Sequence, residues 1–152
     1  MKLDGAYRTV SRAASAEFTE RRSRFIGHAA PVSSEEEAAA FLRKIRSQNR
    51  EARHNVYAWS LQEGMARRHS DDGEPQGTAG MPVLDVLQKS DVTDAAVVVT
   101  RYFGGILLGA GGLVRAYSRA ASLALQKAGV AIMRPCFLLE ILCSYGRYSR
   151  VC

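Results

Sequence analysis

The most restrictive feature of the sequence is an apolar strand that leads through a glycine-rich stretch into a long amphipathic helix. Residues 95–100 are apolar and rich in valine, as expected of a central strand. Residues 101–112 contain five glycines and predict a loop. A stripe at helical spacing follows and predicts the buried face of a helix that ends at Gly129: Leu113, Tyr117, Ala120, Ala124 and Ala128.

Weaker patterns predict the remaining elements. Two antiparallel strands are expected within residues 7–32, with a turn near Glu20 and Arg21. Ser33 and Ser34 precede a helix expected to end near Ser47. The later expectations are a strand at 56–61 whose larger face meets the helices, a loop at 67–80, a helix capped by Thr78, and a strand at 137–142. This order predicts an α+β two-layer sandwich with its helices on one face of the sheet.

Charge is unevenly distributed along the 152 residues, whose net charge is +6. Residues 1–54 hold 11 Lys/Arg against 7 Asp/Glu, and residues 111–152 hold 6 against 1. The intervening residues 55–110 hold 4 against 7 and are acidic. Basic ends favour anionic partners such as nucleic acid, although many soluble proteins are basic without binding RNA.

The glycine-rich stretch is the main candidate for a binding site. A helix N-terminus exposes unpaired amides and attracts anions, and glycines let a backbone approach phosphate closely. The predicted anion or nucleic-acid contacts are Arg101, Gly104, Gly105, Gly109, Gly111, Gly112, Arg115 and Arg119. The same glycines could instead serve positive φ and tight helix packing. Neither the P-loop nor the dinucleotide fingerprint is matched.

A second candidate is the acidic stretch at residues 71–74. Asp71, Asp72 and Glu74 could bind a ligand or perform acid–base chemistry, with His54 as a possible base. A turn of salt-bridged carboxylates is the simpler interpretation. A lone histidine such as His54 or His69 more often makes a structural hydrogen bond. We assign no catalytic residue, metal site or cofactor, and we favour a protein that is not an enzyme.

Three cysteines lie in the last 17 residues, at Cys136, Cys143 and Cys152. Their odd number and the lack of a neighbouring histidine favour free thiols over a disulfide framework or a zinc site. Residues 1–5 lack the apolar core of a secretory signal, and no apolar run reaches the roughly 20 residues that span a bilayer. We therefore expect a cytoplasmic protein without a membrane partner.

Several idiosyncratic stretches, in this order, resemble the IMPACT/YigZ family. They are Ser23-Arg24-Phe25-Ile26, His54 to Trp59, Asp71-Asp72-Gly73-Glu74-Pro75, Gly77 to Pro82, Val99 to Gly105, and Leu108 to Tyr117. The match covers about 105 residues of the sequence.

The resemblance implies a fold similar to domain two of ribosomal protein S five and domain four of elongation factor G. It divides the chain into an IMPACT N-terminal domain at residues 1–130, and a linker with a shortened start of a ferredoxin-like domain at 131–152. Eukaryotic members of the family imply a translational regulator of the starvation response. The proline-dipeptidase label given to some members finds no support in these residues.

These expectations favour a translation-associated module that contacts RNA, the ribosome or a translation-related protein partner. The alternative is a small-molecule enzyme or phosphate-ligand binder that uses the glycine-rich loop together with Asp71 and Asp72. Convergence of His54, Asp71, Asp72 and Arg101 on one concave pocket would favour the alternative.

Overall fold

The computed structural model describes residues 5–151. Residues 1–4, within the stretch where no secretory signal is expected, and the expected free thiol of Cys152 lie outside the described residues. The strands are β1 Tyr7–Val10, β2 Ala14–Glu20, β3 Ser23–Pro31, β4 His54–Ser60, β5 Arg67–Ser70, β6 Ala95–Tyr102 and β7 Val130–Met133. The helices are α1 Glu35–Gln48, α2 Gly80–Lys89, α3 Gly109–Ala128 and α4 Tyr148–Val151, with 3-10 turns η1 Glu63–Met65 and η2 Tyr145–Arg147.

Five strands form one antiparallel sheet in the order β2-β3-β6-β4-β5. The expected central strand is confirmed, because β6 lies in the middle and is buried on both faces. The expected hairpin is also confirmed, with β2 and β3 joined through Arg21 and Arg22. Both turn residues have positive φ, 44° and 66°, as a type I′ hairpin turn requires.

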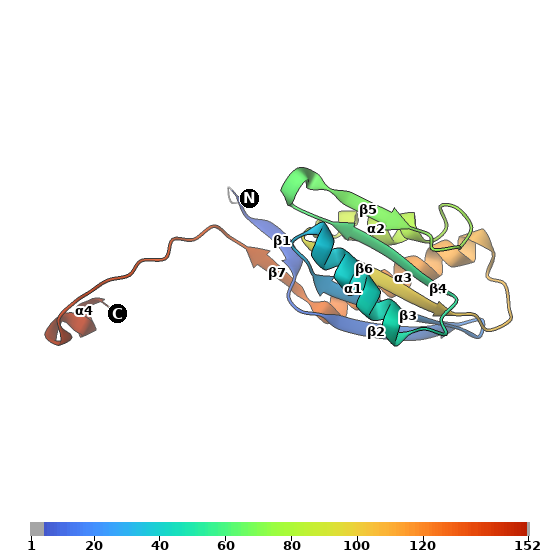
Figure 1. Cartoon of the computed structure of the whole chain (residues 1–152), viewed down its shortest axis with the longest axis horizontal. Helices are drawn as coiled ribbons and strands as arrows, with labels where there is room; N and C mark the ends of the chain where they lie inside the picture. The colour runs from blue at the N-terminus through green and yellow to red at the C-terminus, as the bar shows by residue number, and fades with distance from the viewer. Residues whose placement is uncertain (1–4, 152) are drawn as a thin grey trace.

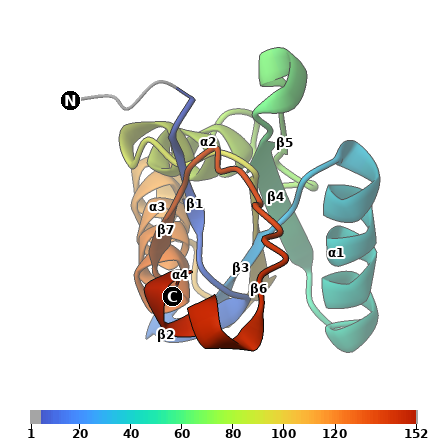
Figure 2. The ribbon, with the colours of Figure 1, turned by 90° about the vertical axis from the view of Figure 1, so that its left-hand side faces the viewer.

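Helices cover both faces of this sheet (Figure 2). Alternate β6 residues Ala95, Val97 and Val99 share a core with α2 and α3. The intervening Ala96 and Val98 share a second core with α1. The mixed α+β class is confirmed, but the expectation that all helices lie on one face is wrong. The alternation of β4 explains the error, because its small residues Val56 and Ala58 meet α2 and α3 while Trp59 meets α1.

The backbone of helix α3 comes into direct contact with the sheet at one point. Its expected buried stripe is confirmed, and the Tyr117 ring packs edge-on against Phe25 of β3 at 5.4 Å. A Cβ atom at Gly27 of β3 would overlap the backbone oxygen of Ala120. The helix backbone therefore rests directly on the strand at Gly27.

Two stretches of the chain differ in secondary structure from the sequence prediction. Residues 67–80 were expected to be loop throughout, but Arg67–Ser70 form the edge strand β5, paired with β4. A strand was expected at 137–142, but Phe137 and Leu142 are almost fully exposed and the segment is irregular. The last strand is instead β7, which pairs with β1. The segment after β7 extends away from the sheet (Figure 1).

The structure describes two of the three cysteines that were expected to be free thiols. Cys136 and Cys143 are exposed free thiols within this C-terminal segment. Among residues 5–151, no helix is long and apolar enough to cross a membrane.

A chain of polar side chains crosses four strands on the α1 side of the sheet. His28 of β3 is hydrogen-bonded at one ring nitrogen to Ser15 (2.7 Å) and at the other to Thr100 (3.3 Å). Thr100 in turn donates to the side-chain oxygen of Asn55 at 2.8 Å. Burial lowers the pKa of His28 from 6.5 to about 4, because the charged imidazolium would lose its hydration.

This lowered pKa predicts that the free energy of unfolding decreases as the pH falls, which gives the pH dependence of stability an acid limb. Between pH 6.5 and about 4 the unfolded chain binds a proton at His28 that the folded chain does not bind. The contribution of His28 is thus complete above pH 6.5 and declines as the pH falls, by an amount of order 2 kcal/mol. We expect His28→Asn to flatten this limb in urea unfolding measured against pH. The control Gln126→Asn, at an exposed position of α3, removes no titrating group and should leave the limb intact, and equal slopes in all three proteins would contradict the assignment.

The contact at Gly27 gives a second prediction. Gly27→Ala should lower the free energy of unfolding by about 3 kcal/mol, because the methyl group must push α3 away from β3. The midpoint of urea unfolding would report the change. Gly146→Ala, where a Cβ would meet nothing within 4 Å, is the control and should leave the midpoint unchanged. A neutral Gly27→Ala would mean that the helix does not rest on the strand.

Candidate functional site

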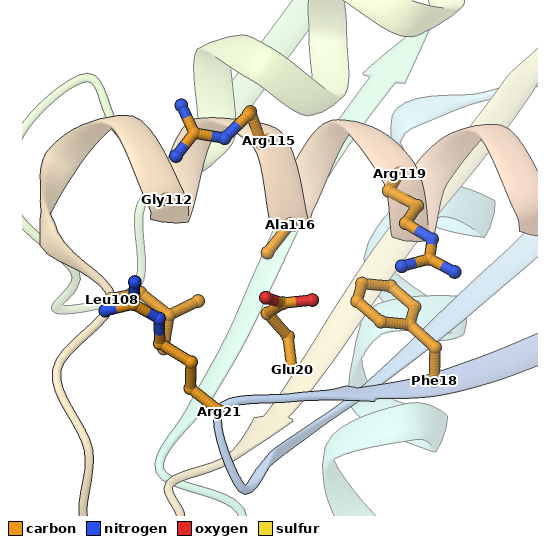
Figure 3. Close-up of a pocket in the computed structure, with 8 residues that line it drawn as sticks. All are labelled: Phe18, Glu20, Arg21, Leu108, Gly112, Arg115, Ala116 and Arg119. Atoms are coloured by element: carbon orange, nitrogen blue, oxygen red, sulfur yellow. The ribbon is translucent and has the colours of Figure 1, made fainter.

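A groove of about 300 Å³ lies between the β2–β3 hairpin and the first half of α3 (Figure 3). The hairpin supplies Phe18, Glu20 and Arg21. Helix α3 and the residue before it supply the other lining residues, Leu108, Gly112, Arg115, Ala116 and Arg119. The contact of β2 and β3 with α3 therefore brings together residues that are about 90 positions apart in the sequence.

The groove has an excess of positive charge. Arg21, Arg115 and Arg119 are exposed, as is the single lining carboxylate, Glu20. Within residues 5–151, none of these four side chains takes part in an ion pair. Three guanidinium groups against one carboxylate leave the groove with a local charge of about +2, which favours an anionic ligand.

Two of the arginines have definite positions in the groove. The Arg119 guanidinium lies over the ring of Phe18, 4.4 Å from its centroid, which is a cation–π contact. The Arg21 Nη1 donates to the backbone oxygen of Leu107 at 3.5 Å. In Figure 3 these two arginines approach from opposite ends of the groove, with Glu20 between them.

The glycine-rich stretch was only partly a loop, because α3 begins at Gly109 and includes Gly111 and Gly112. The N-cap residue Leu108 makes no side-chain hydrogen bond, and the first turn contains no acidic residue. Gly109 and Gly111 are exposed. The first amides of α3 thus lack a side-chain partner from the N-cap and face solvent, which suits an anion.

Arg115 lies against this first turn. A Cβ atom at Gly111 would come within 3.3 Å of the Arg115 Nη1, so the guanidinium lies along the start of the helix. Gly105 and Gly109 have φ of 89° and 73° and allow the loop to turn into α3. A Cβ at Gly104 would overlap the backbone of Arg22, so this glycine serves close packing against the hairpin.

Arg101, by contrast, points into the protein. Only 4% of the residue is exposed, and its Nη1 donates to Glu74 at 2.6 Å while its Nη2 donates to the Ser23 hydroxyl. Its Nε has no acceptor among the described residues. The structure therefore separates Arg101 from Arg115 and Arg119, and its charge is neutralised inside the protein.

Glu74 is the centre of this buried cluster. The same carboxylate oxygen that binds Arg101 accepts the Tyr117 hydroxyl at 2.6 Å. Burial, and secondly the neighbouring Glu74 carboxylate, raise the pKa of Tyr117 far above its ordinary value, so the hydroxyl stays protonated. The other Glu74 oxygen lies 3.8 Å from the His54 Nε2. The cluster ties the 71–80 segment to β6, β4 and α3.

Asp71 organises the turn that precedes α2. It accepts hydrogen bonds from the amides of Gly77, Ala79 and Gly80 at 2.8–3.1 Å. Burial alone would raise the pKa of Asp71, but these amide bonds outweigh it and the pKa is lowered. The expectation that Thr78 caps α2 is wrong, because its hydroxyl donates to the Pro75 oxygen and Asp71 binds the amides instead.

Asp72 and His54 also make structural contacts. The Asp72 carboxylate accepts a hydrogen bond from the backbone amide of Asn55 at 2.7 Å and forms an ion pair with Arg46 at 3.1 Å. The His54 Nδ1 is hydrogen-bonded to the Asp72 backbone oxygen at 2.7 Å. None of the five residues considered for an enzyme lines the groove: His54, Asp71, Asp72, Glu74 and Arg101. Among the described residues, no group of three acids, histidines or cysteines is placed to hold a metal ion.

Comparison with known proteins identifies the family of the chain. The model of the Impact N-terminal domain matches residues 21–125, from the hairpin turn to the last turns of α3. The chain belongs to the IMPACT family. IMPACT family member YvyE of Bacillus subtilis (strain 168) is 48% identical over 126 residues, which are 82% of this chain and 58% of the relative. YigZ of Escherichia coli (strain K12) is 40% identical over 134 residues, 86% of this chain and 66% of the relative.

A solved crystal structure agrees with the fold. The protein in that structure, described as hypothetical, is 37% identical, with a TM-score of 0.81 over 86% of this chain and 65% of that chain. Yih1, described as a two-domain translational regulator, is 34% identical with a TM-score of 0.47, over 80% of this chain and 47% of Yih1. This chain thus spans 47% to 66% of the length of these relatives.

Sequence patterns identified the α3 side of the groove and missed the hairpin side. Phe18, Glu20 and Arg21 were not candidates, because nothing local indicates that the end of β2 lies against α3. The usable signal in the sequence was the turn predicted at Glu20 and Arg21. If the predicted long helix packs on this hairpin, the turn of the hairpin can lie near the start of the helix.

The buried cluster gives a third prediction. Glu74→Ala should lower the free energy of unfolding by about 3–5 kcal/mol, because the Arg101 charge stays buried without its partner. Denaturant unfolding would measure this loss, and Glu63→Ala in the exposed turn η1 is the charge-matched control. An unchanged stability of Glu74→Ala would show that water reaches Arg101 and that the pair does not hold the loops together.

Proposed function

We propose that this IMPACT-family chain is a translation-associated binding module whose groove contacts the phosphates of structured RNA, such as that of the ribosome. The observation that carries the proposal is the gathering of Arg21, Arg115 and Arg119 in one groove beside the open start of α3. Because the proposed partner is ribosomal, we place the protein in the cytoplasm.

The groove has the features that phosphate binding requires. The guanidinium groups are exposed and outside the ion pairs described for residues 5–151, so a phosphate need not displace a carboxylate partner. Arginine matches phosphate geometry with two parallel donors. Phosphate contacts position a protein without reading sequence, so we expect little sequence preference.

The link to translation comes from the family. The relatives include a Saccharomyces cerevisiae IMPACT homologue that is 39% identical over 100 residues, and Yih1 is described as a translational regulator. Because this chain spans only part of its relatives, we restrict the proposal to the groove. A translation-related protein with an acidic surface is the competing partner.

A small phosphate-bearing ligand is the second candidate, because a groove of about 300 Å³ is at the lower end of ligand-site volumes. The enzyme form of this alternative is less favoured, since His54, Asp71 and Asp72 make structural hydrogen bonds away from the groove. Inorganic phosphate or a nucleotide that competes with RNA at micromolar concentration would favour the small ligand.

The proposal predicts salt-dependent RNA binding that requires the groove. Fluorescence anisotropy with a labelled ribosomal RNA hairpin should show affinity falling steeply between about 50 and 200 mM salt. The double change Arg115→Glu and Arg119→Glu should weaken binding at least about tenfold and reduce the salt slope by roughly 2.

The control reverses the same number of charges on another face. Arg43 and Lys44 are exposed on α1, across the sheet from the groove. The change Arg43→Glu with Lys44→Glu should have a much smaller effect on RNA affinity. Equal losses in both double variants would mean that only net charge matters, and a wild-type protein that binds neither the hairpin nor ribosomes would exclude the proposed function.

A further inference from the structure

The least expected member of the groove is its carboxylate. Glu20 lies between Arg21 and Arg119 and projects into the space between them (Figure 3). Its side chain is exposed, and no ion pair or side-chain hydrogen bond within residues 5–151 involves it. Its backbone pairs with Ser23 at the end of the hairpin. Folding therefore has no evident need for an acid at this position.

The two neighbouring arginines contact other groups and form no ion pair with Glu20 among the described residues. The Arg21 guanidinium donates to the Leu107 carbonyl, and Arg119 lies over Phe18. The Glu20 carboxylate oxygens therefore remain available as hydrogen-bond acceptors facing the groove. For a ligand made of phosphates alone this carboxylate is unfavourable, because it repels the phosphate oxygens.

An acceptor set among phosphate-binding donors suits a ligand that presents phosphates and a hydroxyl donor together. The ribose of RNA is such a ligand, because each phosphate is followed by a 2′-hydroxyl that can donate. A carboxylate has only acceptor sites at neutral pH and forms a stronger hydrogen bond with a hydroxyl than a neutral acceptor does. DNA offers the same phosphates without this donor.

We propose that Glu20 accepts a hydrogen bond from a ribose 2′-hydroxyl of the RNA whose phosphates are held by the arginines of the groove. This inference rests on the proposed function and adds the basis on which the groove distinguishes RNA from DNA. The arginines provide affinity for either nucleic acid. Glu20 lowers the affinity for DNA by repulsion and recovers the loss with RNA through the hydroxyl.

The test compares three forms of one unpaired strand: RNA, its 2′-deoxy form and its 2′-O-methyl form. All three carry the same phosphates, and the 2′-O-methyl strand keeps an RNA-like sugar conformation without the hydroxyl donor. We expect the unchanged protein to bind RNA about five- to tenfold more tightly than either other form. Binding is followed by anisotropy at fixed salt.

Two changes at Glu20 separate charge from hydrogen bonding. Glu20→Ala should tighten binding of the deoxy and methyl strands several-fold and bring all three affinities within about twofold of one another. Glu20→Gln removes the charge but keeps an amide oxygen as acceptor, so it should tighten all three strands and keep part of the preference for RNA. The control Glu36→Ala removes an exposed acid of α1 and should leave the preference unchanged.

The outcomes distinguish this inference from the proposed function. Equal binding of the three strands by the unchanged protein, or a uniform gain for all three in Glu20→Ala, would overturn the role of Glu20 and leave the arginine groove standing. A uniform loss in Glu20→Ala would indicate that Glu20 contacts a base amino group and would also overturn it. Failure of the unchanged protein to bind any of the three strands or the ribosomal RNA hairpin would remove the proposed function and this inference together.

Discussion

The buried pair of Glu74 and Arg101 is the interaction on which the arrangement of the site depends. Glu74 sits on the segment before α2, Arg101 on the central strand β6, and Tyr117 on α3, and one carboxylate oxygen binds both partners at 2.6 Å. Placing two charges in the interior carries a desolvation cost that good geometry must offset. Here that geometry joins two glycine-rich segments that otherwise have few side chains with which to pack.

The structure divides its charged residues between two kinds of work. Arg101 and the acids at 71–74 neutralise one another or bind backbone amides, and they fix the loops. Arg21, Arg115 and Arg119 face solvent on the surface that those loops position. In the sequence, the arginines of the glycine-rich region cannot be told apart by these two roles. Burial alone separates the arginine that holds the fold from the arginines that are free to meet a ligand.

Much of the fold could be predicted from the sequence, and three of the eight residues that line the groove, Gly112, Arg115 and Arg119, were among the predicted contacts. The apolar period predicted β6 and the buried stripe of α3 correctly, and the serine pair Ser33 and Ser34 predicted the start of α1, because each is decided by residues close in the chain. The edge strand β5 was missed, since Arg67–Ser70 has no apolar alternation and exists by pairing with β4. The strand expected at 137–142 reflects apolar composition without a partner among the described strands. Glu20 and Arg21 join the site only through long-range packing, to which a local pattern is blind.

The contact of Gly27 with the backbone of Ala120 also bears on how the groove would meet a ligand. One wall of the groove belongs to the hairpin that includes Gly27, and the other to the helix pressed against it. The two walls cannot separate without breaking this contact, so the groove keeps its width in the free protein. Such preorganisation spares the loss of conformational entropy on association and permits fast, nearly rigid docking. Discrimination between ligands would then depend on side chains already in position after folding rather than on adjustment during the encounter.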